Sequence, residues 1–191
     1  DSRISLKDTQ IGNLTNRITF ISKAIQRLTK LQIIYFANSP FTYDNIAVDW
    51  EDANSDYAKQ YENEELSWSN LKDLTDVELY NCPNMTQLPD FLYDLPELQS
   101  LNIACNRGIS AAQLKADWTR LADDEDTGPK IQIFYMGYNN LEEFPASASL
   151  QKMVKLGLLD CVHNKVRHLE AFGTNVKLTD LKLDYNQIEE I

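Results

Sequence analysis

Residues 131–145 read IQIFYMGYNNLEEFP, and this stretch decides the fold. Its apolar side chains are spaced three, two, five and three residues apart: Ile131, Phe134, Met136, Leu141 and Phe144. That spacing fits neither an amphipathic helix nor a simple alternating strand. It predicts a short strand, with Phe134 and Met136 on one side and Tyr135 on the other, and then a turn. Asn139, whose amide both donates and accepts hydrogen bonds, points inward at this turn.

The same template recurs along most of the chain. Six copies align by the residue at the Asn position: Ser39, Cys82, Asn106, Asn139, Asn164 and Asn186. Successive intervals are 43, 24, 33, 25 and 22 residues. A unit of 22 to 25 residues accounts for three of them, and insertions of roughly 19 and 9 residues account for the other two. An earlier, degraded copy is suggested by Asn16, Ile18 and Ile21.

The segments that follow the turns also repeat. Residues 21–31 and 88–98 share apolar residues at their first, fifth, eighth and eleventh places. This spacing predicts a short helix or an extended turn that leads to the next strand.

A period of 22 to 25 residues with this pattern resembles the leucine-rich repeat over nearly the whole chain. The resemblance implies an α/β fold, a right-handed solenoid in a horseshoe arc. A parallel β-sheet lines its concave side, and short helices or turns form its convex side. We expect one domain over residues 1–191, with insertions at about 42–66 and 109–128. The linkers are similar to those of secreted or surface repeat proteins of gut bacteria, which implies an extracellular or cell-surface location.

In this family the asparagines form an internal ladder that satisfies buried backbone groups of the turns. Asn139→Ala is therefore expected to cost about 1–3 kcal/mol of stability. Leu183→Ala is expected to cost about 2–5 kcal/mol through the cavity that it leaves. Ser39 and Cys82 depart from Asn, and Cys is a familiar substitute at this position of the repeat.

The two insertions differ in character. Residues 42–66 hold eight acids and one base, which indicates either a solvated excursion or a lid beside the concave face. In the second, Ser110 and Gln113 form a capping-box pattern. An apolar helical stripe follows it: Ala111, Leu114, Trp118 and Leu121. Residues 123–128, DDEDTG, lack the full spacing of a calcium loop and read as an acidic turn.

The family's ligand surface is formed by the strand residues that face outward on the concave side. Carried onto this chain, these positions hold five of the nine tyrosines, together with several carboxylates. Tyrosine is enriched at interfaces because it offers a large contact area at a low cost in entropy. The candidate partner-binding residues are Tyr35, Asp76, Glu78, Tyr80, Asn102, Tyr135, Tyr138, Asp160, His163, Lys182, Asp184 and Tyr185. Some of these columns could instead pack against the acidic insertion.

The composition of the chain argues against some classes of binding partner. A net charge of −11 argues against nucleic acid or an anionic membrane surface, because both require a basic footprint. No apolar run is long enough to span a membrane, and the N-terminal residues do not form a signal peptide. The template calls for Pro after Ile191, so we expect the chain to be part of a longer protein with further repeats.

Catalysis has little support. Asp160, Cys161 and His163 resemble a nucleophile cluster, but the register turns Cys161 into the core. No zinc spacing, phosphate loop or dinucleotide motif is present, so no metal or cofactor is expected. The three cysteines read as free thiols in or near the core, and a Cys82–Cys105 disulfide is disfavoured because the two lie in different columns.

The sequence therefore predicts a non-enzymatic module that binds a protein or peptide, with a preference for a basic partner. The alternatives are a glycan-binding surface protein, since tyrosines beside carboxylates also suit sugars, and a structural spacer in a larger surface protein.

Overall fold

The computed structural model describes residues 3–6, 23–40, 67–123, 130–144, 147–169 and 177–189. Its strands are β1 (Arg3–Leu6), β2 (Ile33–Ala37), β3 (Asp76–Tyr80), β4 (Ser100–Asn102), β5 (Ile133–Tyr135), β6 (Leu158–Asp160) and β7 (Asp180–Lys182). Its helices are η1 (Lys23–Arg27), η2 (Trp68–Asn70), η3 (Asp90–Asp94), α3 (Ala111–Asp123) and α4 (Ser147–Lys152), of which the three named η are 3-10 helices.

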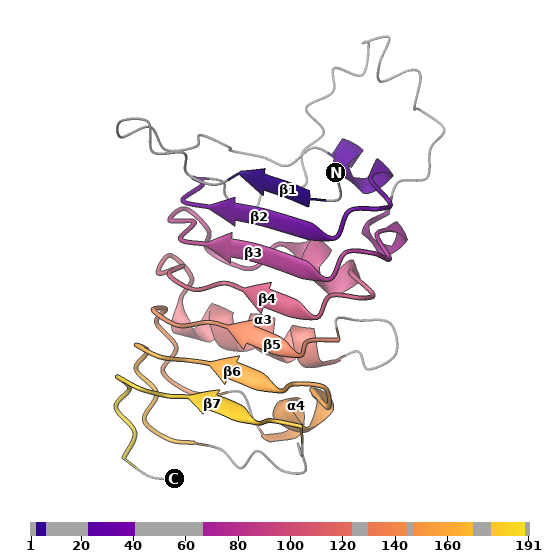
Figure 1. The fold of residues 1–191 in the computed structure, drawn as a ribbon. Helices are drawn as coiled ribbons and strands as arrows, with labels where there is room; N and C mark the ends of the chain where they lie inside the picture. Colours follow the sequence, from indigo (N-terminus) through magenta and orange to yellow (C-terminus); the bar gives the residue numbers. More distant parts are fainter. Residues whose placement is uncertain are drawn as a thin grey trace.

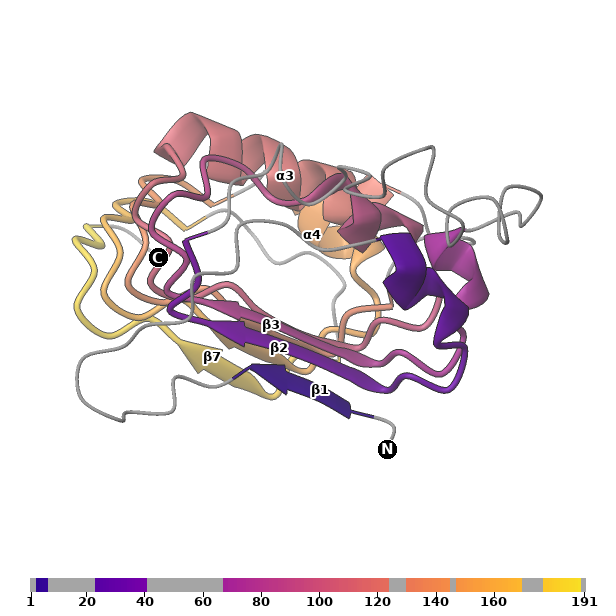
Figure 2. The ribbon, with the colours of Figure 1, turned by 90° about the horizontal axis from the view of Figure 1, so that it is seen from above.

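The seven strands form one parallel sheet in which each strand pairs with the next in the sequence (Figure 1). Helices α3 and α4 lie on one side of the sheet (Figure 2). We call the opposite side of the sheet the concave face. The predicted fold class, a repeat solenoid with a parallel sheet, is confirmed.

The strand register is the predicted one. Phe134 pairs with Leu101 on one side and with Leu159 on the other, and Tyr135 lies between Asn102 and Asp160. Phe134, Leu101 and Leu159 are buried, because the core positions of successive repeats stack on one another. Parallel pairing keeps every copy of the template in phase, so equivalent residues form columns across the strands.

The predicted asparagine ladder is present. Asn139 Nδ2 donates to the carbonyls of Met136 (3.0 Å) and Ile103 (3.1 Å), and Asn139 Oδ1 accepts from the backbone N–H of Asn106 (2.7 Å). Each amide thus satisfies one carbonyl of its own turn and one of the preceding repeat. Asn164 and Asn186 repeat this pattern of donation. Buried turn backbone is paired in this way without regular secondary structure.

Two of the three cysteines occupy core positions of the repeats as free thiols. Cys82 is fully buried at the ladder position, and burial raises the pKa of its thiol to about 12. Its Sγ lies 3.7 Å from the carbonyl oxygen of Tyr80. Cys161 is also fully buried, whereas Cys105 is partly exposed, and all three cysteines are free.

Helix α3 supplies most of the helical layer. Trp118 is fully buried and packs against Phe134 and Phe144, with ring centroids 5.5 and 5.6 Å away. Ser110 Oγ accepts from the backbone N–H of Gln113 at 3.2 Å, as the capping pattern predicts. The second half of the capping box does not form, because Gln113 Nε2 donates to Asp117 instead (2.7 Å).

Several features depart from the sequence interpretation or lie beyond the described residues. Strand β1 precedes the first predicted copy and pairs with β2, from Arg3 opposite Ile33 to Leu6 opposite Phe36. The linkers predicted to form a short helix or an extended turn contain the 3-10 helices η1 and η3, in agreement with the prediction. The degraded copy at residues 16–21, the acidic insertion 42–66 and residues 124–128 lie outside the described residues. None of the described helices is long and apolar enough to cross a membrane.

Candidate functional site

The predicted recognition residues form columns on the concave face. The central column consists of paired residues in β2 to β7: Tyr35, Glu78, Asn102, Tyr135, Asp160 and Lys182. Asp76 belongs to the column before it, and Tyr80 and Asp184 to the column after it. The strands thus hold side chains from six repeats on one continuous face.

The residues that precede the ladder positions share an unusual backbone conformation. All six have a positive φ, between 51° and 64°: Asn38, Asn81, Cys105, Tyr138, His163 and Tyr185. Such angles are uncommon in residues other than glycine, and Asn tolerates them better than bulky residues do. The turn requires them, because these N–H groups continue the hydrogen-bond ladder beyond the strand ends. Tyr138, for example, donates to the carbonyl of Val162 at 2.9 Å, and His163 to that of Asp184 at 2.9 Å.

Three residues of this column stack as an aromatic ladder, which we define as Tyr138, His163 and Tyr185. Ring centroids are 4.2 Å apart between Tyr138 and His163 and 4.1 Å apart between His163 and Tyr185. Interplanar angles of 17° and 11° make both contacts nearly parallel. Tyr138 is 39% exposed and Tyr185 is 75% exposed, so the ladder is a surface feature at the rim of the concave face.

Two polar residues of the central column form hydrogen bonds with the backbone of the segment that follows them. Asn102 Oδ1 accepts from the backbone N–H of Ala104 (3.0 Å), and Asp160 Oδ1 accepts from that of Val162 (3.2 Å). Asp160 Oδ2 also lies 3.7 Å from Lys182 Nζ. These contacts stabilise the ends of the strands. The sequence interpretation assigned the residues to partner binding and did not anticipate these structural contacts.

The acids in the preceding column bond to neighbouring hydroxyl groups. Thr75 Oγ1 donates to Asp76 Oδ2 at 2.6 Å, and Thr179 Oγ1 donates to Asp180 Oδ2 at 3.2 Å. Asp180 was not among the candidate site residues. A Thr-Asp pair stands at the start of both strands, β3 and β7. This pair is the sequence signal that marks Asp76 and Asp180 as equivalent positions.

An apolar pair interrupts the polar surface. Ile133 on β5 is 36% exposed, and its register partner Leu158 on β6 is half-buried. Both point to the concave face, where isolated apolar side chains are common but a paired set next to aromatic residues suits an interface. Site prediction from the sequence omitted this pair from the candidate list.

The tyrosines at the other end of the face remain protonated at neutral pH. Burial, and to a smaller extent the charge of Glu78, raises the pKa of Tyr35 above its usual value. Interaction with the Cys105 side chain is the largest influence that raises the pKa of Tyr80.

The suspected nucleophile cluster does not assemble. Cys161 is fully buried, and burial raises the pKa of its thiol well above the usual value. Asp160 and His163 lie on the opposite side of the strand end, toward the concave face. Among the described residues, no group of three or more His, Cys, Asp or Glu side chains could hold a metal ion.

Comparison with known proteins places this geometry in context. No model of a known protein family matches the chain. Over its whole length the chain is 60% identical to a leucine-rich repeat protein from Bacteroides eggerthii, with a TM-score of 0.86, and it spans 31% of that protein's solved chain.

Two more distant matches are receptors. One is the leucine-rich-repeat ectodomain of the Arabidopsis thaliana receptor kinase GASSHO1/SCHENGEN3, at 18% identity and a TM-score of 0.61. It is matched by 97% of this chain, which spans 18% of that ectodomain. The other is Toll-like receptor 7 of Drosophila melanogaster, 31% identical over 107 residues, which make up 55% of this chain and 7% of the receptor. The chain therefore spans less than a third of each of these three proteins.

Proposed function

We propose, from the premise that this chain is a leucine-rich-repeat protein, that it is a non-enzymatic module that binds a protein or peptide across its concave face. The observation that carries this proposal is the aromatic ladder, Tyr138–His163–Tyr185. The fold demands a positive φ at these positions, but it does not demand aromatic rings, since Asn38 and Asn81 meet the same backbone requirement. The requirements of the fold therefore do not by themselves explain the aromatic rings at these positions.

The concave face offers a peptide three kinds of contact, each from a different column of side chains. The apolar pair Ile133–Leu158 suits an apolar side chain, and the aromatic ladder lies at the far end of the same strands. Tyr135 lies between them in the central column. A segment that crosses the strands over β5 and β6 would bury all three, and buried aromatic anchors provide much of the affinity of protein interfaces.

The charge of the face favours a basic partner. Asp76, Asp180 and Asp184 stand on it, and the whole chain carries a net charge of −11. Carboxylates that line a recognition surface raise the association rate of a basic partner and disfavour acidic ones.

Glycan binding is less well supported by the same geometry. Sugars bind tyrosine through the flat face of the ring, but the rings of Tyr138 and His163 are stacked face to face. The ladder therefore presents mainly ring edges and hydroxyl groups, which suit peptide amides and side chains. The outer face of Tyr185, 75% exposed, is the part of the ladder best suited to a sugar.

The relatives fit a recognition role outside the cell. The plant ectodomain was solved in complex with CASPARIAN STRIP INTEGRITY FACTOR 2, and the other receptor match is a Toll-like receptor. These relatives support our proposal of an extracellular or cell-surface location. A single repeat domain over residues 1–191 is proposed from the period of the sequence.

The proposal is tested by selecting peptides from a random display library on the immobilised chain. Binding of the selected peptides is then compared in three variants, Tyr138→Asn, His163→Asn and Tyr185→Asn. Asn preserves the positive φ that the turn requires, because Asn38 and Asn81 already adopt it. Lys155→Ala, which changes an exposed residue beyond α4, is the control.

We expect the selected peptides to lose about tenfold or more in affinity in at least one ladder variant, as for interface anchors, and to bind the control unchanged. Peptides that bind all three variants as tightly as the wild type would contradict the proposal. A glycan array that binds the wild type but not Tyr185→Asn would favour the sugar alternative.

A further inference from the structure

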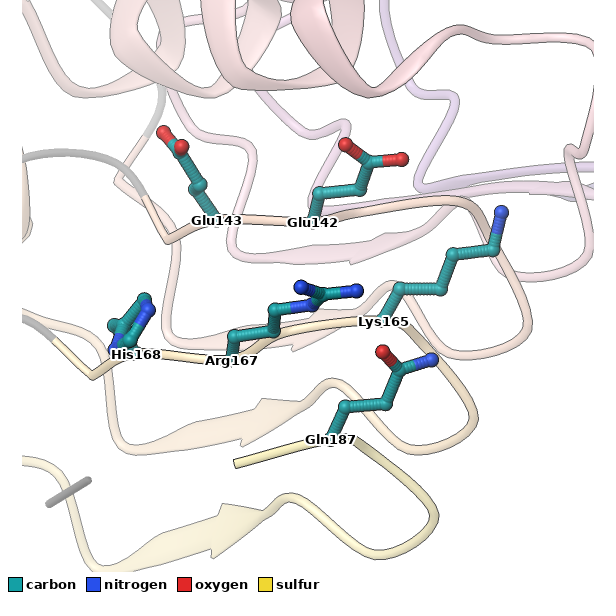
Figure 3. Close-up of a pocket in the computed structure, with 6 residues that line it drawn as sticks. All are labelled: Glu142, Glu143, Lys165, Arg167, His168 and Gln187. Carbon is teal, nitrogen blue, oxygen red and sulfur yellow. The ribbon is translucent and has the colours of Figure 1, made fainter. Parts of the chain in front are cut away.

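A second site lies on the flank of the solenoid, between the sheet and the helical layer. It is a groove of about 410 Å³ lined by polar side chains from three successive repeats: Glu142, Glu143, Lys165, Arg167, His168 and Gln187. Figure 3 shows Lys165 and Arg167 rising from one chain segment toward the segment that carries Glu142. None of these residues belongs to the concave face.

The backbone under the groove is held by its own parallel ladder. The N–H of Lys165 donates to the carbonyl of Leu141 (2.8 Å), and the N–H groups of Gln187 and Glu189 donate to the carbonyls of Val166 and Arg167 (both 2.9 Å). Val166 is fully buried, while Lys165 and Arg167 are exposed. This alternation is that of an extended segment, so the two cations stand on the same side, roughly 6.6 Å apart along the chain.

Neither cation of the groove forms an ion pair with a described residue. Lys165 and Arg167 make no ion pair in the described part of the chain, whereas Lys115 bonds to Glu143 at 2.5 Å. Lys115, and more weakly His168, lowers the pKa of Glu143. The negative charge of Glu143 is therefore balanced by Lys115. Glu142 is left to face the two positive charges of Lys165 and Arg167. The groove is locally basic on a protein with a net charge of −11.

We propose that this groove binds an extended acidic segment of a partner protein, with two carboxylates two residues apart. One carboxylate is bound by the Arg167 guanidinium, whose planar fork matches a carboxylate in a bidentate manner. The other is bound by the ammonium of Lys165, at the spacing that an extended peptide presents. The Gln187 amide, on the neighbouring segment, bonds to the peptide backbone.

A carboxylate fits this groove better than a phosphate does. Glu142 lines the same hollow, and a nearby negative charge opposes a dianion more strongly than it opposes a singly charged group. This groove is also distinct from the peptide-binding surface proposed on the concave face. The acidic residues of that face disfavour an acidic ligand there.

The test is a chemical-shift titration of the isotope-labelled chain with the capped pentapeptide AEAEA. Capped AKAKA, capped AQAQA and inorganic phosphate serve as comparison ligands. The variants are Lys165→Gln and Arg167→Gln. The matched control is Lys72→Gln, another exposed lysine without an ion pair among the described residues.

We expect saturable shifts at residues 142, 165–168 and 187 with AEAEA, weaker binding by about tenfold in each groove variant, and no change with Lys72→Gln. Binding is expected to weaken with added salt and to persist in Tyr138→Asn, which separates this site from the concave face. The proposal fails if AEAEA gives no saturable shift, if AQAQA or AKAKA binds as well, or if phosphate binds more tightly than AEAEA.

Discussion

At the scale of single residues, the turn after each strand is the most constrained part of the repeat. One residue takes a positive φ, and the next uses its side chain to satisfy buried backbone groups. Asn139 bonds to the carbonyls of Met136 and Ile103 and to the N–H of Asn106, so its amide connects its own repeat to the preceding one. Its loss leaves polar groups unpaired in the core.

Asn139→Ala is expected to lower the free energy of unfolding by about 1–3 kcal/mol. Asn140→Ala is the matched control, because Asn140 is half-buried and makes one exposed bond, to the Arg107 carbonyl at 3.0 Å. The measurement is urea unfolding of both variants and the wild type. Equal losses at the two positions would show that the internal ladder carries no special weight.

At the scale of elements, helix α3 is anchored to the preceding repeat by a buried carboxylate. Asp117 is 2% exposed and accepts hydrogen bonds from the backbone N–H of Leu88 (2.9 Å), from Gln113 Nε2 (2.7 Å) and from the Tyr93 hydroxyl (3.3 Å). The Arg120 guanidinium lies 3.6 Å from the centroid of the Tyr93 ring. Burial is the largest influence on Asp117 and raises its pKa, although these bonds partly oppose the shift.

Because the folded-state pKa of Asp117 is above its unfolded value, protonation of this group favours the folded state. Its contribution to stability is fully present below about pH 3.9, the usual pKa of Asp, and is lost as the pH rises through the folded-state pKa. In Asp117→Asn this dependence is absent. Urea unfolding from pH 4 to pH 7 is expected to show the wild type losing stability relative to the variant as the pH rises. A constant difference across that range would contradict the expectation.

At the scale of the whole molecule, stability depends on the stacking of repeats, and burial is unequal along the described sheet. Leu159 on β6 is fully buried, whereas its register partner Leu181 on β7 is 37% exposed. Leu183, expected from the sequence to be a core residue, is only partly buried. The cost of Leu183→Ala is therefore expected at the lower end of the range of about 2–5 kcal/mol, because a partly buried side chain leaves a smaller cavity.

Leu159→Ala is expected to cost about 2–5 kcal/mol and Leu181→Ala less than about half of that. The two residues form a matched pair, since they share a column and differ mainly in exposure. Thermal and urea unfolding of the two variants measure the difference. Similar costs at both positions would mean that β7 is as well covered in solution as β6.

The periodic spacing of apolar residues and Asn determined the architecture in advance. Each copy places its apolar residues at the same intervals, and a unit that cannot bury its own apolar face must stack on its neighbours. Together with the resemblance to the leucine-rich repeat, this argument predicted the parallel sheet, its register and the column Tyr35 to Lys182. Strand β1 was missed because residues 3–6 are too few to reveal a period and are not followed by a recognisable Asn turn.

The sequence by itself determined which residues face inward and which face outward, because side-chain direction follows from the period of two along a strand. Only the tertiary structure decided how the outward residues meet. The parallel stack of Tyr138, His163 and Tyr185 depends on neighbours more than 20 residues away, and so does the groove that brings Glu142, Lys165 and Gln187 together. Distances between repeats are set by the packing of the whole solenoid, and no local pattern encodes them.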